Sequence, residues 1–181
     1  YSPSLLTAYL VVAYVFPLIQ DTRVSATISS SVRFGKLSFS LLRPYPYLLA
    51  IAIQAIAVSV LRFVMLLPLI VLLTLGFSEL RSVALSVEPV VLMSFLGALV
   101  VGVICNILIR MVFGLLAFDM TQTWGPELVL LSFVTLAGGE AYPLDLLPQP
   151  WFDLASWTPA FYMAGFPALV LLGRLTPDQS L

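Results

Sequence analysis

The chain has 181 residues, of which 61% are hydrophobic and only 9% are charged, and its net charge is −1. Soluble domains carry roughly a quarter charged residues, so this chain has too few polar groups to cover a soluble surface, and we expect an integral membrane protein. The charge balance excludes a basic nucleic-acid binder, the single Cys105 excludes a disulfide scaffold, and the absence of His excludes Ser-His and Cys-His catalysis.

Four stretches with at most one charge predict membrane spans, because a spanning helix needs about 20 apolar residues. They cover about 4–20, 47–75, 89–112 and 124–138. The second stretch contains Arg62 and either spans with tilt or breaks near Pro68. The third could continue toward Phe118, and the fourth ends at Gly138-Gly139, which is a plausible helix stop.

The basic residues predict the orientation of these spans. Four of the eight bases fall between residues 21 and 46, against one acid, Asp21. Loops rich in Lys and Arg stay on the cytoplasmic side, so we expect this loop inside the cell. Residues 139–165 hold three acids and no base, which fits the outer side.

The loop 21–46 contains a predicted amphipathic helix. Val24, Ile28 and Val32 recur every four residues and form one helical face, and Gly35 can end the helix. Such a piece can lie along the membrane surface or dock on a cytoplasmic partner. The alternative is an ordinary positive loop that only fixes topology.

The segment 139–173 predicts an outer elbow followed by short re-entrant or interfacial helices. Prolines prevent one continuous helix here, at Pro143, Pro148, Pro150, Pro159 and Pro167. Aromatic residues such as Trp151 and Trp157 suit the headgroup layer. A simple extracellular loop is the alternative.

Polar residues inside the predicted spans are few. A central Arg costs roughly 2.5–3.5 kcal/mol on insertion scales, so Arg62 should face protein or water, with Gln54 near the same face. Asn106 and Arg110 are four residues apart and share a face. These four residues form either a functional polar seam or ordinary interhelical hydrogen bonds.

Catalytic and cofactor motifs are absent from the sequence. Lys36 lacks the glycine-rich spacing of a phosphate loop, so we expect no ATP site of that kind in this chain. The acids are spread over loops, without the paired arrangement that a metal or acid-base site needs. We therefore predict no cofactor and no enzyme activity.

Three motifs resemble those of ABC-2 type transporter permeases. The stretch Arg33-Phe34-Gly35-Lys36-Leu37, followed by Leu41-Leu42-Arg43-Pro44, resembles the family's Arg–x–Gly–x–Leu and Leu–Leu–(Arg/Lys)–Pro pattern. Gly138, followed by Pro143-Leu144-Asp145 and Pro148, is similar to its outer segment. Ala117-Phe118 resembles the family's Ala–Phe–Trp, although Asp119 stands where Trp is usual. The resemblance covers nearly the whole chain in the right order.

The resemblance implies an all-α, polytopic transmembrane helical bundle with a cytoplasmic amphipathic coupling helix and an outer re-entrant segment. It implies the permease subunit of an ATP-driven exporter in the inner (cytoplasmic) membrane. Its partners would be a separate ABC ATPase subunit and a second permease subunit, as a homodimer or heterodimer. Full members usually have six spans, so we expect the first and last to lie outside residues 1–181.

The resemblance also assigns roles to residues. Coupling to the ATPase would fall on Arg33, Gly35, Lys36, Leu37, Arg43 and Pro44. An outer gate would include Gly138, Pro143, Leu144, Asp145 and Pro148.

Two other functions compete with the exporter. An ion-driven secondary transporter usually places acids at the membrane midplane beside broken helices, whereas the acids here lie in loops. An intramembrane enzyme would need converging ionisable groups, and only Arg62, Arg110 and Glu127 are candidates.

Overall fold

The computed structural model describes residues 3–20, 22–77, 81, 88–120 and 123–172, and the regular elements in these ranges are all helices. The longer helices are α1 (Pro3–Gln20), α2 (Val24–Arg33), α4 (Tyr47–Gly76), α6 (Pro89–Leu115) and α7 (Trp124–Ala137). The shorter ones are α3 (Leu37–Leu41), η1 (Leu116–Phe118), η2 (Leu144–Leu146), α8 (Gln149–Ser156), α9 (Pro159–Met163) and α10 (Gly165–Leu171). The predicted stretches 4–20, 47–75, 89–112 and 124–138 thus correspond to α1, α4, α6 and α7, and α3 was not predicted.

Two of the described helices are long and apolar enough to cross a membrane, namely α4 and the continuous stretch Pro89–Phe118. A helix of 30 residues is about 45 Å long and exceeds a hydrocarbon core of about 30 Å. Only 6% of the most apolar part of α4 is buried, whereas a core helix of a soluble protein would be mostly covered. The helix also continues through Pro68, so the break considered there does not occur. We conclude that α4 presents an apolar surface suited to lipid.

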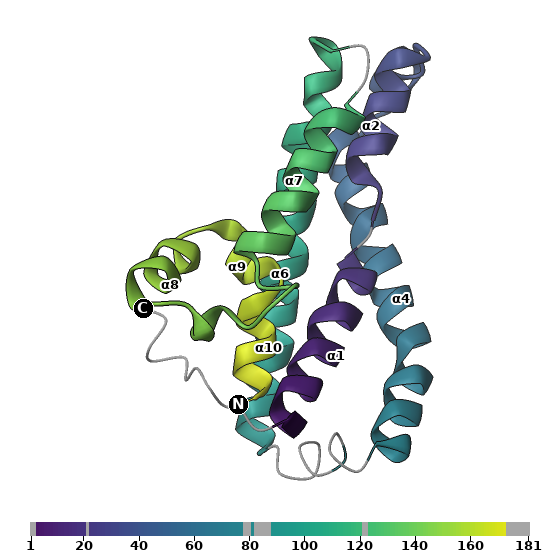
Figure 1. Cartoon of the computed structure of the whole chain (residues 1–181). Coiled ribbons are helices and arrows are strands. Elements are labelled where there is room, and N and C mark those ends of the chain that lie inside the picture. The colour runs from purple at the N-terminus through teal and green to yellow at the C-terminus, as the bar shows by residue number, and fades with distance from the viewer. Residues whose placement is uncertain (1–2, 21, 78–80, 82–87, 121–122, 173–181) are drawn as a thin grey trace.

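Helix α6 is the centre of the bundle. It packs against α2, α9, α10 and α4. Figure 1 shows α4 and α6 running the full height of the molecule, with α1 and α2 nearly end to end between them. In the same view α7 lies along the upper half of α6 and α10 along its lower half, while α8 projects to one side. The long helix α4 therefore lies beside the shorter helices α1 and α2, and the long helix α6 lies beside α7 and α10.

The predicted amphipathic helix is present as α2, but its apolar face is used inside the chain. Val24 and Ile28 are each 1% exposed and pack in one cluster with Ile107 and Met111 of α6. A Cβ at Gly114 would lie 2.9 Å from Cβ of Ile28, which shows how closely the two helices approach. The sequence left a membrane surface or a cytoplasmic partner as what this face would cover, whereas Val24 and Ile28 pack mainly against α6.

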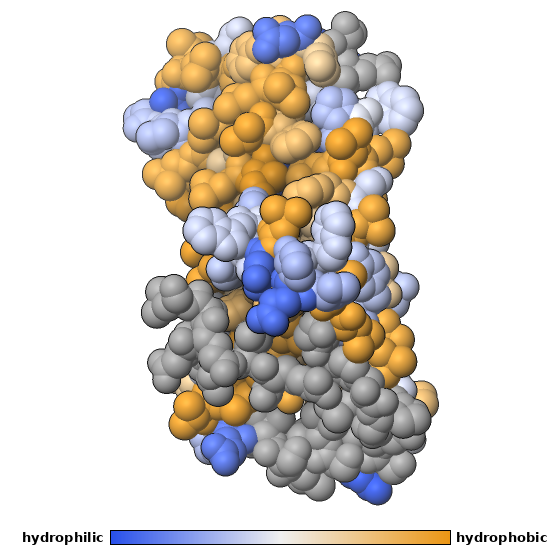
Figure 2. Space-filling view, turned by 60° about the vertical axis from the view of Figure 1, so that its left-hand side comes forward, coloured by the Kyte–Doolittle hydropathy of each residue, from blue (hydrophilic) through white to orange (hydrophobic). Residues whose placement is uncertain are grey.

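Residues 138–172 form an elbow that contains η2, followed by the short helices α8, α9 and α10. Helix α7 ends at Ala137, and Gly139 has φ +80°, a conformation that glycine adopts without steric cost. Pro159 begins α9, where its missing N–H needs no partner. Figure 2 shows a face on which a broad hydrophobic surface in the upper half ends at a group of hydrophilic residues at mid-height.

Candidate functional site

A chain of buried polar groups joins three helices that are distant in the sequence. Nε2 of Gln20, the last residue of α1, donates to the backbone carbonyl of Met163 at 2.6 Å. Oε1 of Gln20 accepts from Nδ2 of Asn106 at 2.9 Å, and Oδ1 of Asn106 accepts from Nε of Arg110 at 2.8 Å. Gln20 is 3% exposed and Asn106 is 5% exposed, so water does not replace these partners. We call Gln20, Asn106, Arg110 and the Met163 carbonyl the polar junction.

A glycine allows the polar junction to form. Gly102 lies one turn before Asn106 and so on nearly the same face of α6. A Cβ at Gly102 would lie 2.8 Å from the carbonyl oxygen of Tyr162 and 3.4 Å from Nε2 of Gln20. Any larger residue would push α9 and the end of α1 away from α6.

The polar junction lies beside a bend between α1 and α2. Arg23, which immediately precedes α2, has φ 49° and ψ 28° and is left-handed. This conformation costs a non-glycine residue roughly 1–2 kcal/mol. Beyond the bend, the hydroxyls of Ser29 and Thr123 are 2.7 Å apart and tie α2 to the start of α7. Helix α1 is thus hydrogen-bonded to the end of α9, whereas α2 is hydrogen-bonded to the start of α7.

A second buried contact ties α1 to the elbow. Oη of Tyr9 donates to the carbonyl of Gly139 at 2.6 Å, and the Tyr9 side chain is fully buried. Among the residues predicted for an outer gate, Gly138, Pro143 and Leu144 are buried in or beside this contact region. Pro148 is exposed before α8, and the backbone of Asp145 belongs to η2.

The residues predicted for coupling lie at the basic end of the bundle. Arg33, Gly35, Lys36, Arg43 and Pro44 are exposed, whereas Leu37 is half-buried. We call residues 33–44 the basic tip.

Cations in the basic tip sit beside aromatic rings. Cζ of Arg33 is 5.1 Å and Nζ of Lys36 is 6.0 Å from the ring centroid of Phe34. Nη1 of Arg43 donates to the hydroxyl of Tyr45 at 2.7 Å. The tip therefore presents apolar and cationic groups together on an exposed surface.

The four polar residues predicted inside the spans do not form one seam. Asn106 and Arg110 meet in the polar junction, but Arg62 instead donates from Nη1 to the carbonyl of Leu18 at 3.1 Å. Gln54 is exposed on α4. The sequence interpretation missed Gln20, although its place as the polar end of an uncharged run was the available signal.

Glu140 is an acid near the polar junction, in the elbow that follows α7. Its Oε2 accepts from the hydroxyl of Thr135 at 3.2 Å. Burial raises the pKa of Glu140 above 4.5, while the Thr135 hydrogen bond and the charge of Arg110 act in the opposite direction. Arg110 thus interacts with both Asn106 and the elbow.

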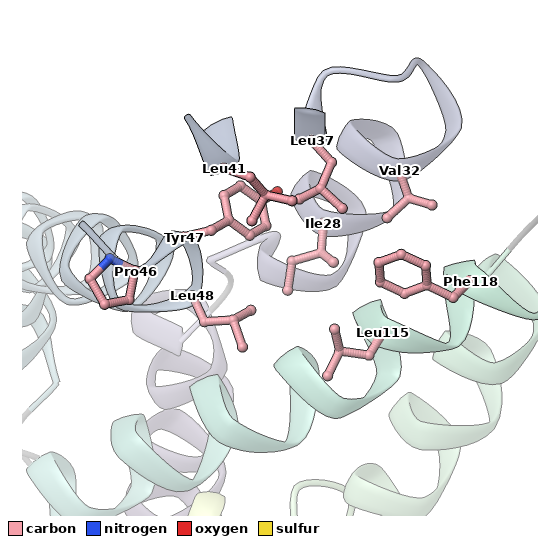
Figure 3. Close-up of a pocket in the computed structure, with 9 residues that line it drawn as sticks. All are labelled: Ile28, Val32, Leu37, Leu41, Pro46, Tyr47, Leu48, Leu115 and Phe118. Atoms are coloured by element: carbon pink, nitrogen blue, oxygen red, sulfur yellow. The ribbon is translucent and has the colours of Figure 1, made fainter. Parts of the chain in front are cut away.

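An apolar groove lies under the basic tip (Figure 3), with a volume of about 380 Å³. Its walls come from α2, α3, the start of α4, the end of α6 and η1. Ile28 and Leu115 face each other across it, and Leu48 and Phe118 close two of its sides.

The arrangement as a whole consists of packing contacts and hydrogen bonds between helices. Within the described ranges, no group of three or more His, Cys, Asp or Glu side chains is placed to hold a metal ion. What the geometry does provide is a set of fixed links between α1, α2, α6 and the elbow.

Comparison with known proteins gives one finding. A family model described as an ABC-2 family transporter protein matches residues 4–181. Neither a curated protein nor a solved structure matches the chain.

Proposed function

The chain belongs to the ABC-2 family of transporter proteins, and from this premise we propose that it is the permease subunit of an ATP-driven exporter. Members of this family act as membrane permeases of ABC transporters and associate with an ABC ATPase subunit. In the proposal the spans of this chain cross the inner (cytoplasmic) membrane, and a second permease subunit completes the transport path.

We propose that the ATPase docks on the basic tip. The apolar face of α2 is buried against α6, whereas most of residues 33–44 are exposed and accessible to a partner. Phe34 is 62% exposed and Phe39 is 77% exposed, beside Arg33, Lys36 and Arg43. Aromatic residues and Arg are the side chains that most often carry binding energy at interfaces.

The polar junction then provides a path by which docking of the ATPase changes the position of the elbow. The basic tip continues into α2, and α2 is tied to α7 through Ser29 and Thr123. On the far side of the bend at Arg23, Gln20 is hydrogen-bonded to the end of α9. A movement of α2 about this bend therefore changes the relative position of α7 and α9, which flank the elbow. Packed helices of this kind switch between discrete arrangements rather than deform smoothly.

The observation that carries the proposal is the exposed basic tip joined by fixed contacts to the elbow, within a chain of this family. The test uses the chain with its ATPase in lipid vesicles, measuring ATP hydrolysis and ATP-dependent export of a reporter substrate. Arg33→Gln with Lys36→Gln and Arg43→Gln should lower both at least about tenfold, because charged groups at an interface set both encounter and specificity.

Arg81→Gln is the matched control, since Arg81 is also exposed but lies in a different connection of the chain. It should leave coupling intact. Normal hydrolysis and export in the triple variant would refute docking on the tip. Transport that continues without ATP would instead support an ion-driven transporter.

A further inference from the structure

The apolar groove under the basic tip has the chemistry of a ligand site. Its volume of about 380 Å³ lies within the range of about 300–1,000 Å³ typical of small-molecule sites. Its lining is apolar except for the hydroxyl of Tyr47. Figure 3 shows the labelled side chains from the several elements converging on one space.

One polar atom in this lining lacks a partner. Oη of Tyr47 is buried, and the described residues supply no hydrogen bond to it. A buried hydroxyl without a partner is costly, so native structures nearly always satisfy it with protein, water or ligand. Oη of Tyr47 has almost no accessible surface, so an occupant of the groove pairs with it only after the side chain turns toward the groove. A mostly apolar occupant that carries an oxygen acceptor would then satisfy both the lining and this hydroxyl.

The surroundings of the groove are basic. Arg33 follows the lining residue Val32, and Lys36 precedes the lining residue Leu37. Residues 22–48 contain four bases and no acid, while Asp119 follows the lining residue Phe118. Basic pockets between helices on the cytoplasmic side of a membrane favour anionic lipid headgroups.

The groove also adjoins the apolar outer surface of α4. Leu48 lines the groove and is 39% exposed, and the next residues facing outward, Leu49 and Ile53, are exposed as well. An acyl chain can pass from this surface into the groove without crossing water, whereas a soluble peptide has no such path.

We propose that the groove holds an acyl chain of an anionic phospholipid from the cytoplasmic leaflet. In this complex the Tyr47 side chain turns toward the groove and donates to an ester or phosphate oxygen, and the headgroup lies among Arg33, Lys36 and Arg43. The inference rests on the proposed cytoplasmic placement of the basic tip, but it does not depend on coupling to an ATPase.

The test uses the purified full chain in detergent, without the ATPase, so its failure leaves the coupling proposal standing. Phosphatidylglycerol and phosphatidylcholine with identical acyl chains are titrated separately, and retained lipid is measured by native mass spectrometry. Phosphatidylglycerol should bind more tightly, by about fivefold for each base that contributes. Equal retention of the two lipids would overturn the proposal.

Val32→Trp fills the groove and should reduce retention of phosphatidylglycerol about tenfold or more, because an occupied groove cannot admit a chain. Val64→Trp is the matched control, since Val64 is an exposed valine on α4 outside the groove. Unchanged retention in Val32→Trp would also overturn the proposal.

Tyr47→Phe removes only the hydroxyl and keeps the ring. It should weaken binding of phosphatidylglycerol about fivefold while leaving the lipid-free chain equally or more heat-stable, because the unpaired group is gone. A lipid-free chain that becomes less stable, with lipid binding unchanged, would show a structural role for the hydroxyl and contradict the proposal.

Discussion

At the scale of single residues, Gln20 matters because of the partners that surround it. One amide supplies a donor to the backbone of α9 and an acceptor to Asn106 of α6. Both partners are shielded from water, so neither can be satisfied by solvent when Gln20 is changed.

We predict that Gln20→Leu lowers the free energy of unfolding by about 2–3 kcal/mol, because it leaves the Met163 carbonyl and the Asn106 amide unpaired. Gln54→Leu makes the same chemical change at an exposed position of α4 and should be neutral or stabilising. Unfolding of both purified variants in detergent, followed by heat or denaturant, measures the difference. A similar stability for the two variants would contradict the polar junction.

Glu140 provides a pH-dependent prediction. Because its pKa is raised in the folded chain, the folded state binds more protons than the unfolded state from pH 4.5 up to that raised value. Stability should therefore fall as pH rises through this interval. Glu140→Gln removes the titration, so its melting temperature should depend less on pH and be higher at neutral pH.

Asp153→Asn serves as the control for this pH series, because it neutralises an exposed carboxylate on α8. The control should keep the pH dependence of the unchanged protein. A Glu140→Gln variant with the original pH dependence would show that another group is responsible.

At the scale of elements, α6 has glycines in two different surroundings. A Cβ at Gly114 would lie 2.9 Å from Cβ of Ile28 and 3.1 Å from Cα of Ser25. A Cβ at Gly97 would have no atom within 4 Å. Replacing each of these two glycines by alanine therefore distinguishes the effect of close helix packing on stability from the effect of helix propensity.

We predict that Gly114→Ala costs about 1–3 kcal/mol, because α2 must move away from α6. Gly97→Ala should instead be neutral or stabilising by up to about 1 kcal/mol, because alanine favours a helix more than glycine does. Thermal unfolding of the two variants checks both values. Equal effects of the two changes would mean that α2 does not pack as closely as described.

The helices could be predicted from sequence because they depend on local signals. Uncharged runs locate α4 and α6, and the recurrence of Val24 and Ile28 locates α2. The sequence could not show which surface the face of α2 covers, since that depends on Gly114, about 90 residues away. The contact between Gln20 and the end of α9 likewise spans 143 residues and leaves no periodic signal.

At the scale of the whole molecule, the basic tip lies at one end of the bundle, and the elbow follows the end of α7 that is farther from the tip. Figure 1 shows α2 toward one end and α10 toward the other, with α6 alongside both. The proposed orientation therefore predicts that the tip is reached from the cytoplasm and the elbow from outside.

This prediction can be checked by cysteine labelling in oriented membranes, after Cys105 is replaced by Ala. Ser38→Cys in the tip should react only with reagent added on the cytoplasmic side, and Gln149→Cys at the start of α8 only with reagent added outside. Both side chains are exposed, so access depends on the membrane and not on burial. Labelling of Ser38→Cys from outside would invert the topology and refute the transporter assignment built on it.

The small share of α4 that is covered by its own chain has a consequence for biogenesis. A segment that carries a single charge and needs few neighbours can enter the bilayer as soon as it leaves the insertion machinery. The pieces α9 and α10 are five and seven residues long, too short to cross on their own, and they require α6 to be in place. We therefore expect the helices to fold in the order of synthesis, so that α9 and α10 pack onto an α6 that is already in the membrane.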